Sequence, residues 1–247
     1  MWKKKALLAG FVAAAGALAI GSSAQAAMVA TFAGTIERGF DATGAFGPGV
    51  TDLAGKGFTL VYRYDPNDPA GTTGPYDPSL HSSEIFQGGP NVFTAAMSIE
   101  GVEYFNAGRL FGYALFLEEP SWPLSQVSYE VEDEYDDPID SDYHYTINMR
   151  AELFSEIGNN ICPPPASVNN VFSYTLQPGE IGSGEFSFHR RHDTTGDLDP
   201  NRAYAFLRPT SVTVAWVPEP GAWALMIVGF GMTGGLLRAR RGALAVG

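Results

Sequence analysis

Two stretches of this sequence concentrate oxygen-bearing side chains that could bind a metal ion. The first is the acidic run EVEDEYDDPIDSD, residues 130–142. The second is HDTTGDLDPN, residues 192–201. Its candidate ligands are Asp193, Asp197, Asp199 and Asn201. Calcium takes several oxygen ligands, many of them carboxylates, from flexible loops, so calcium binding is one interpretation of either stretch.

Both stretches also have a simpler explanation. A run of like charges is usually a solvated loop, and residues 130–142 lack the spacing of an EF-hand. Asp and Asn are common in turns because their side chains accept hydrogen bonds from nearby backbone amides. We therefore interpret 130–142 as a solvated loop and 192–201 as an Asx-rich turn, with calcium binding as the alternative.

Residue patterns for other catalytic chemistry are not found. His81, His144, His189 and His192 occur without an H-x-x-x-H motif or a cysteine pair, so the sequence has no zinc motif. It also lacks a G-x-S-x-G motif, a phosphate-binding loop and a dinucleotide fingerprint. A glycosidase with two facing carboxylates remains an alternative interpretation, because such acids meet only in the folded protein. The sequence favours a protein that is not an enzyme and predicts no cofactor.

The elements that would position these residues have the period of β-strands. Apolar and polar residues alternate in FTLVYRY (58–64), YHYTINMR (143–150) and SVTVAW (211–216). The residues expected to share one face within their strands are Phe58, Leu60, Tyr62 and Tyr64; Tyr143, Tyr145, Ile147 and Met149; and Val212, Val214 and Trp216. Further candidate strands are VATFAGTI, VFTAAMSI, GYALFLE, VSYEVE, VFSYTL, GEFSFH and RAYAFL. MSIEGVEYF predicts a hairpin that turns at Glu100 and Gly101.

These strands predict a single all-β domain over residues 27–216. We expect an antiparallel β-sandwich, such as a jelly roll, because two sheets then bury one face each against the other. Hydrophobic residues make up 45% of the chain, which is enough to build a core. Cys162 is the single cysteine and cannot form an internal disulfide. Its neighbours ICPPP indicate a loop thiol, with a bridge to another molecule as the alternative.

The charge of the chain argues against nucleic acid as a partner. Lys and Arg number 15 and Asp and Glu number 27, which gives a net charge of −12. Six of the basic residues lie in the first five and last ten positions, so the body is more acidic than the whole chain. An acidic surface repels phosphate backbones and anionic lipid headgroups.

The beginning of the chain has the features of a Sec-type signal peptide. Lysines at 3–5 precede an apolar stretch at 6–20, and Ala24 and Ala26 form an A-x-A site. Cleavage is expected between Ala26 and Ala27. The alternative is an uncleaved anchor, for which the apolar stretch is short. We therefore expect the Sec translocon to export this chain through the inner membrane.

The end of the chain has the features of a short transmembrane helix. Residues 221–237 contain no ionisable side chain and reach the lower end of the roughly 17 to 25 residues that span a bilayer. Pro218 and Pro220 keep Glu219 in an extended segment before the helix. Arg238 begins a basic cluster that belongs on the cytoplasmic side.

These residues resemble the PEP-CTERM sorting signal, in its variant with P-E-P-x-x-W-A, a glycine-rich span and terminal arginines. The signal residues are Pro218, Glu219, Pro220, Trp223, Ala224, Gly229, Phe230, Gly231, Arg238, Arg240 and Arg241. In that family the tail is recognised and cut by an exosortase, a membrane protease of bacteria that secrete exopolysaccharide. Ala239 interrupts the arginine cluster here, and residues 242–247 extend beyond it as a short tail.

The resemblance implies that residues 217–241 hold the chain in the inner membrane only until an exosortase removes them. The alternative is an ordinary membrane protein with a retained anchor. The segment that begins FAGTIERGF also resembles uncharacterised β-rich proteins that carry this tail, through Asp52, Leu53, Ala54, Gly55 and Phe58. That likeness implies a shared fold and no activity.

The sequence thus predicts an exported, non-enzymatic protein of the cell envelope, cell surface or exopolysaccharide matrix. The expected partners are the translocon, the exosortase and the inner membrane before processing, with exopolysaccharide as a further candidate. Eleven tyrosines, four tryptophans and many acids suggest an alternative, a glycan-binding or glycan-cleaving domain. A calcium-dependent adhesin is the third hypothesis.

Overall fold

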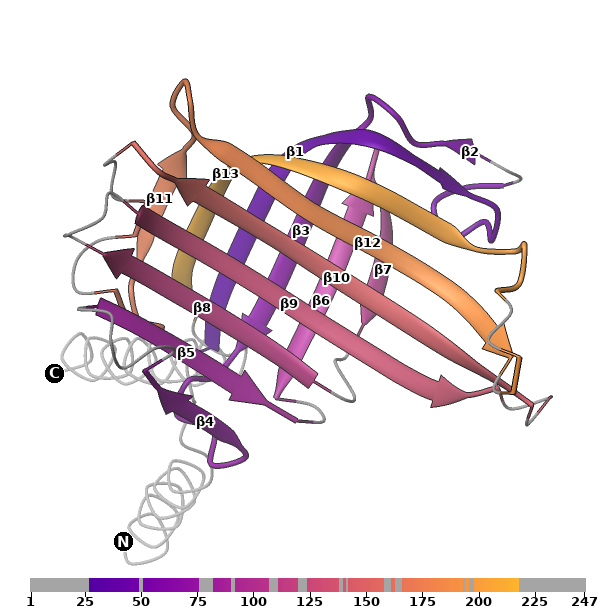
Figure 1. Ribbon diagram of the computed structural model, residues 1–247, viewed down its shortest axis with the longest axis horizontal. Coiled ribbons are helices and arrows are strands. Elements are labelled where there is room, and N and C mark those ends of the chain that lie inside the picture. The colour runs from indigo at the N-terminus through magenta and orange to yellow at the C-terminus, as the bar shows by residue number, and fades with distance from the viewer. Residues whose placement is uncertain are drawn as a thin grey trace, which may run out of the picture. The chain divides into compact units, whose positions relative to one another are not determined.

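Alternating side chains build thirteen β-strands in the part of the chain that the computed structural model describes (Figure 1). The strands are β1 (Ala27–Asp41), β2 (Thr51–Asp52), β3 (Gly57–Tyr64), β4 (Gly71–Gly74), β5 (Ser82–Gly88), β6 (Phe93–Ile99), β7 (Val102–Asn106), β8 (Phe111–Glu119), β9 (Leu124–Asp136), β10 (Tyr143–Ser155), β11 (Phe172–Thr175), β12 (Ile181–His192) and β13 (Ala203–Val217). The expectation of an all-β antiparallel domain is therefore confirmed.

The structure describes most of the body of the chain. The described residues are 27–48, 51–75, 82–89, 92–106, 111–119, 124–137, 140, 142–157, 161–162, 166–192, 194–195 and 198–217. Within them, Met28–Trp216 belongs to one compact unit, and no helix is long and apolar enough to cross a membrane. The expected signal peptide, and the expected sorting signal from Pro218 onward, lie outside the described residues.

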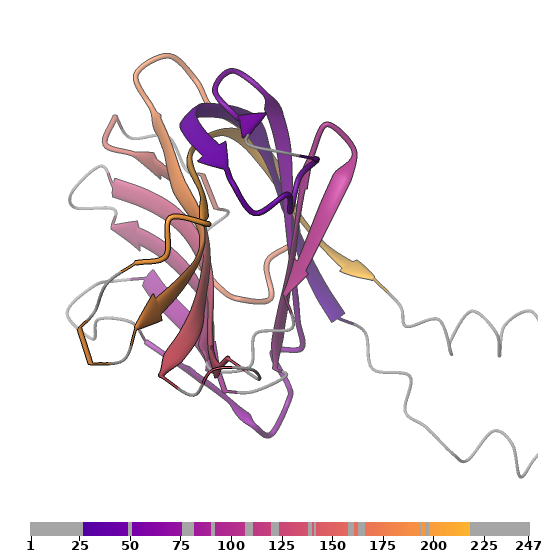
Figure 2. The same cartoon turned by 90° about the vertical axis from the view of Figure 1, so that its right-hand side faces the viewer.

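All thirteen strands belong to one continuous sheet. Their order is β4-β5-β8-β9-β10-β12-β13-β1-β3-β6-β7, while β11 pairs with β13 and β2 pairs with β1. The sheet curls so that β8, β9 and β10 lie opposite β1, β3 and β6 (Figure 2). The two separate sheets that we expected are thus two halves of one open, curled sheet, joined through β12, β13 and β1.

The core lies between these two halves and is rich in aromatic side chains. Tyr62 on β3 is fully buried, and its hydroxyl donates a 3.0 Å hydrogen bond to the Met149 carbonyl on β10. The hydroxyl of Tyr64, also on β3, lies 3.2 Å from the Tyr129 hydroxyl on β9. The rings of Tyr62 and Tyr129 stack with centroids 5.3 Å apart. These contacts connect strands that are far apart within the sheet.

The strands read from alternation are confirmed, with one merger. RAYAFL and SVTVAW form a single strand, β13, which pairs with β12 through residues 203–207 and with β11 through residues 211–214. The buried positions change phase between Pro209 and Val212, where the strand changes partner. Trp216 is 37% exposed, so the expectation that it shares the buried face of Val214 is wrong.

The hairpin expected in MSIEGVEYF is confirmed. β6 and β7 pair directly, and Ile99 lies opposite Val102. The two turn residues, Glu100 and Gly101, have φ angles of 50° and 86°. Two consecutive positive φ angles are the requirement of the tight type I′ turn, which matches the twist of the flanking strands.

Candidate functional site

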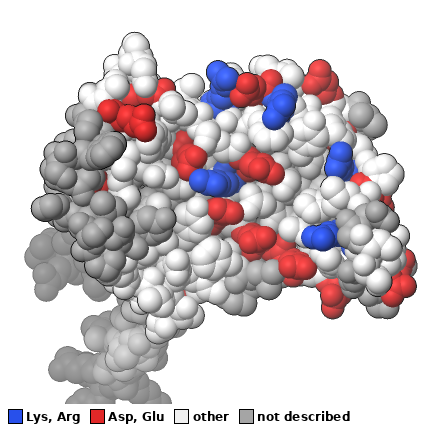
Figure 3. Space-filling view, in the orientation of Figure 1, with Lys and Arg blue, Asp and Glu red and all other residues white. Residues whose placement is uncertain are grey.

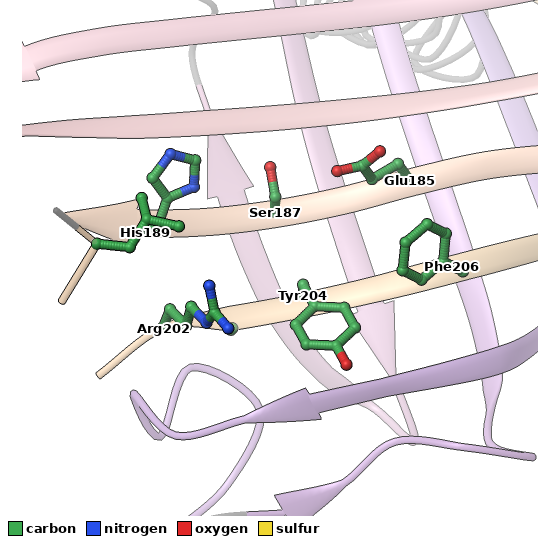
Figure 4. Close-up of a pocket in the computed structure, with 8 residues that line it drawn as sticks. Glu185, Ser187, His189, Arg202, Tyr204 and Phe206 are labelled. Carbon is green, nitrogen blue, oxygen red and sulfur yellow. The ribbon is translucent and has the colours of Figure 1, made fainter. Parts of the chain in front are cut away.

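A hollow on the outer face of the sheet lies over β12 and β13. Side chains of opposite parity on these strands, such as Phe186 and Ala205, belong to the core, so the intervening residues face outward. The register places Glu185 opposite Phe206 and Ser187 opposite Tyr204. The hollow measures about 350 Å³, which lies within the usual range of small-ligand sites. Its lining consists of Glu185, Ser187, His189, Leu198, Arg202, Ala203, Tyr204 and Phe206 (Figure 4).

β13 reverses the usual distribution of large and small side chains at this hollow. The inward positions carry Ala203 and Ala205, whereas the outward positions carry Tyr204 and Phe206. Aromatic side chains contribute most to stability when they are buried, so their placement on an outer face calls for an explanation. Binding of a ligand with an apolar face is such an explanation.

Neighbouring side chains hold the two rings in place. The Tyr204 ring contacts Phe40 of β1 edge to face at a centroid distance of 4.7 Å, and it meets Phe206 at 5.8 Å. The guanidinium of Arg38 lies 4.2 Å from the centroid of Phe206, a cation–π contact. The hollow therefore has a preformed aromatic surface.

The polar groups of the hollow differ along its length. Figure 4 shows Glu185 near Phe206, and it shows His189 and Arg202 toward the other end. The pKa of His189 is lowered, first by burial and then by the positive charges of Arg191, His144 and Arg202. His189 is therefore neutral near pH 7, and the lasting positive charge at this end comes from arginine.

The polar groups of the described lining suit non-covalent binding of a ligand. Glu185 is the one carboxylate among the described residues that line the hollow. Both standard glycosidase mechanisms need two carboxyl groups on opposite sides of the bond that is cleaved. A hydroxyl, an imidazole, a guanidinium and a carboxylate beside aromatic rings instead suit recognition of a polyhydroxylated ligand.

A second outer hollow, of about 520 Å³, lies where β12 and β13 diverge. Its charged groups already pair with one another, since Arg208 contacts Glu37 at 2.9 Å. Glu180 accepts a hydrogen bond of 2.6 Å from the Tyr174 hydroxyl. These pairs leave fewer free groups for a ligand than the first hollow has.

The acidic run is largely a strand, so its interpretation as a solvated loop is wrong for residues 130–136. These residues continue β9, and Glu132, Glu134 and Asp136 are exposed while Val131 is buried. Figure 3 shows acidic side chains across this face with single basic side chains among them. Strand alternation places Glu132, Glu134 and Asp136 in solvent, whereas Asp133 is buried on the same face of the strand as Val131. The run therefore forms a polar strand face.

The two acidic stretches meet around Arg190 of β12. Its guanidinium contacts Asp137 at 2.6 Å and Asp140 at 3.4 Å, both from the first stretch. It also lies 3.7 Å from Asp199, which belongs to the second stretch, and 3.8 Å from the Tyr143 ring centroid. Desolvation lowers the pKa of Arg190, but the hydrogen bond and charge of Asp137, together with the charges of Tyr145 and Asp140, outweigh it, so that the pKa is raised. An arginine thus supplies the positive charge that a metal ion would bring.

The second stretch forms the expected Asx turn where it is described. The Asn201 amide donates a 2.7 Å hydrogen bond to the Asp199 carboxylate. Asp193 and Asp197 lie outside the described residues. Among the residues that the structure does describe, no group of three or more His, Cys, Asp and Glu side chains could hold a metal ion.

Cys162 is a buried thiol. It is 0% exposed and its sulfur lies 3.9 Å from the Ser125 hydroxyl. Burial is the main reason that the pKa of this thiol is raised to about 11. Cys162 lies outside the described strands, as expected for a loop thiol, and a bridge to another molecule would require the structure around it to open.

Comparisons with protein-family models, curated proteins and solved structures found no match to this chain. The residues expected to form the signal-peptide cleavage site and the sorting signal, apart from Ala27, lie outside the described part of the chain. Sequence reasoning did not select Glu185, Ser187, Tyr204 or Phe206 as functional. The outward aromatic residues of RAYAFL, with alanines between them, were the signal that could have identified this face.

Proposed function

We propose that this chain is an exported, non-enzymatic protein of the cell envelope or exopolysaccharide matrix that an exosortase sorts and processes. The observation that carries the proposal is the Pro-Glu-Pro motif with its apolar span and terminal arginines, at 218–241. The structure is compatible with this reading, since β13 ends at Val217, immediately before that motif. Removal of the residues from Pro218 onward would leave every described strand intact.

The processing step is tested by replacing Pro218, Glu219 and Pro220 with alanines in a host that has the exosortase. The mature protein should keep its tail and remain in the inner membrane, which intact-mass spectrometry and fractionation detect. A matched control replaces Leu244 and Val246, beyond the arginines, and should be processed normally. Normal processing of the triple variant would refute the sorting proposal.

A second candidate function is saccharide binding at the hollow over β12 and β13. It is favoured by the outward Tyr204 and Phe206 rings beside the polar side chains of Glu185 and Ser187. Sugars present apolar ring faces together with hydroxyl groups, which match such a surface. Replacing Tyr204 with alanine should weaken oligosaccharide binding measured by calorimetry.

A calcium-dependent adhesin has less support. The carboxylates of Asp137, Asp140 and Asp199 converge on Arg190, so their charge is already neutralised in part. A cation that joined them would have to displace the guanidinium. We therefore do not retain this hypothesis for the described residues.

A further inference from the structure

The hollow over β12 and β13 has a charge pattern that goes beyond general saccharide binding. Three arginines of the described domain are paired with carboxylates: Arg150 with Glu152, Arg190 with Asp137 and Arg208 with Glu37. Arg202 differs from these three, and it is the arginine that lines the hollow. Within the described part of the chain, no carboxylate lies within ion-pair distance of its guanidinium.

Arg202 is nevertheless held in position. Its backbone amide donates to the Pro200 carbonyl at 3.1 Å, and its own carbonyl accepts a 3.0 Å hydrogen bond from the Ala42 amide. The side chain is half-buried, and its guanidinium lies 5.9 Å from the Phe40 ring centroid. A half-buried guanidinium without a counter-ion is a ready partner for an anionic group, because it can donate two parallel hydrogen bonds to a carboxylate.

The surroundings of Arg202 strengthen its positive field. The charges of Arg191 and Arg202 both act on the neighbouring His189 and lower its pKa, after the larger effect of burial. The body of this protein is acidic overall, so a positive end of one hollow is a local exception. An anionic ligand is therefore attracted to this end of the hollow, while the rest of the acidic surface repels polyanions.

The end of the hollow opposite Arg202 carries a hydrogen-bond acceptor for the hydroxyl groups of a ligand. Glu185 is exposed and can accept hydrogen bonds from O–H donors, and Ser187 lies between Glu185 and His189 on the same strand. Four residue steps separate Glu185 from His189, which at about 3.3 Å per residue span roughly 13 Å. This length accommodates a short oligosaccharide along the rings of Tyr204 and Phe206.

We propose that the hollow binds a saccharide that carries a carboxylate, of the uronic-acid class. The ligand's carboxylate pairs with Arg202, its ring contacts Tyr204 and Phe206, and its hydroxyls donate to Glu185. The inference rests on the saccharide-binding function proposed above and specifies its ligand. It requires no chemical step, only a non-covalent complex.

The test uses the full-length chain in detergent and a panel of glucuronate, galacturonate and mannuronate di- to tetrasaccharides, each paired with its methyl ester. The ester keeps the sugar ring and removes the charge. Calorimetry should show that at least one acid form binds more tightly than its ester. Arg202→Gln should reduce affinity for that acid on the order of tenfold or more and should leave binding of the ester nearly unchanged.

Arg63→Gln is the matched control, because Arg63 is an exposed arginine on β3 that does not line the hollow. It should not alter affinity. Tyr204→Ala should weaken both the acid and the ester, since the ring contacts the sugar and not its charge. Thermal melting of each variant shows whether the fold is retained.

The outcomes distinguish the acidic-ligand inference from saccharide binding in general. Equal binding of acid and ester, or an Arg202→Gln variant that binds the acid like the unmodified chain, overturns the acidic-ligand inference and retains saccharide binding. If no member of the panel binds at millimolar concentration, both fail. The sorting proposal is independent of each result, because the mass of the processed protein tests it.

Discussion

A buried hydrogen bond connects the two halves of the sheet through the core. Tyr62 is fully buried, and its hydroxyl donates to the Met149 carbonyl on a strand of the opposite half. Burial raises the pKa of Tyr62 well above its usual value, which keeps the hydroxyl protonated and able to donate. The bond therefore connects the two halves of the sheet at every ordinary pH.

Replacing Tyr62 with phenylalanine should destabilise the domain. The substitution leaves the Met149 carbonyl without this donor in the core, which costs about 1 to 3 kcal/mol. Chemical denaturation followed by tyrosine fluorescence or circular dichroism measures the change. Tyr204→Phe, on the outer face, is the control and should remain within about 0.5 kcal/mol of the parent protein. Equal stability of Tyr62→Phe and the parent would contradict the role of the bond.

The Cys162 thiol should react slowly in the folded protein. It is fully buried and the pKa of the thiol is raised to about 11, so little thiolate forms at pH 8 and reagents have no direct access. Incubation with iodoacetamide, quenching and mass spectrometry should show little labelling without denaturant and complete labelling in guanidinium chloride. Rapid labelling of the native protein would show that the thiol is accessible.

Because Arg190 already pairs with the carboxylates around it, added calcium should not stabilise this loop further. The guanidinium already contacts Asp137, whose side chain is 4% exposed. Millimolar calcium should leave the melting temperature of the protein unchanged, as measured by differential scanning fluorimetry. Arg190→Gln should lower that temperature, because a buried carboxylate then loses its positive partner. A rise with calcium in the unmodified protein would restore the metal-binding hypothesis.

The backbones of β1 and β13 approach each other closely at Gly34. A Cβ atom added to Gly34 of β1 would lie 2.1 Å from the Arg208 carbonyl oxygen of β13. No side chain fits in this space, so glycine permits the approach of the two backbones. This contact joins one half of the sheet to the other.

Gly34→Ala should therefore weaken the domain. The added methyl group would force β1 and β13 apart, and overpacking of this kind typically costs about 1 to 3 kcal/mol. Gly57→Ala is the matched control on β3, because its Cβ would meet only the Gly34 carbonyl at an ordinary 3.9 Å. Urea denaturation compares both with the parent chain. A Gly34→Ala protein as stable as the control would show that the strands can separate without cost.

The sequence predicted the elements better than it predicted their connections. Alternation identified most strands, because burial of one face imposes a two-residue period that is visible locally. β5 (Ser82–Gly88) was missed since its sequence, SSEIFQG, alternates weakly. The candidate strand VSYEVE already covered residues 130–132, but the charge of residues 133–136 hid the continuation of this strand to Asp136. Strand order depends on long-range packing, which no local pattern records.

The candidate site was even less predictable. Its residues come from GEFSFH and RAYAFL, which were recognised only as strands. The β12–β13 register brings these residues together. Among the described residues, Arg202 is free to bind an anion because carboxylates of the fold contact other arginines. Those facts belong to the folded chain. The outward Tyr204 and Phe206 were visible in the sequence once Ala203 and Ala205 were known to face inward.

At the scale of the whole domain, the first and last strands lie beside each other in the middle of the sheet. The order β12-β13-β1-β3 makes β13 the connection between the two halves. The buried hydrophobic core among the described residues runs from Met28 to Val214. A complete core thus requires β13, and processing at the tail can leave the core intact only beyond that strand.

Removal of the proposed sorting signal should therefore leave the stability of the β domain unchanged. The melting temperature of the full-length chain in detergent should match that of the exosortase-processed protein in the same detergent, measured by circular dichroism at the strand signal. The reason is that the described core, from Met28 to Val214, and all the described strands lie within residues 27–217. A processed protein that melts several degrees lower would show that the tail stabilises the domain, and it would then be a structural part of the mature protein instead of a removable signal.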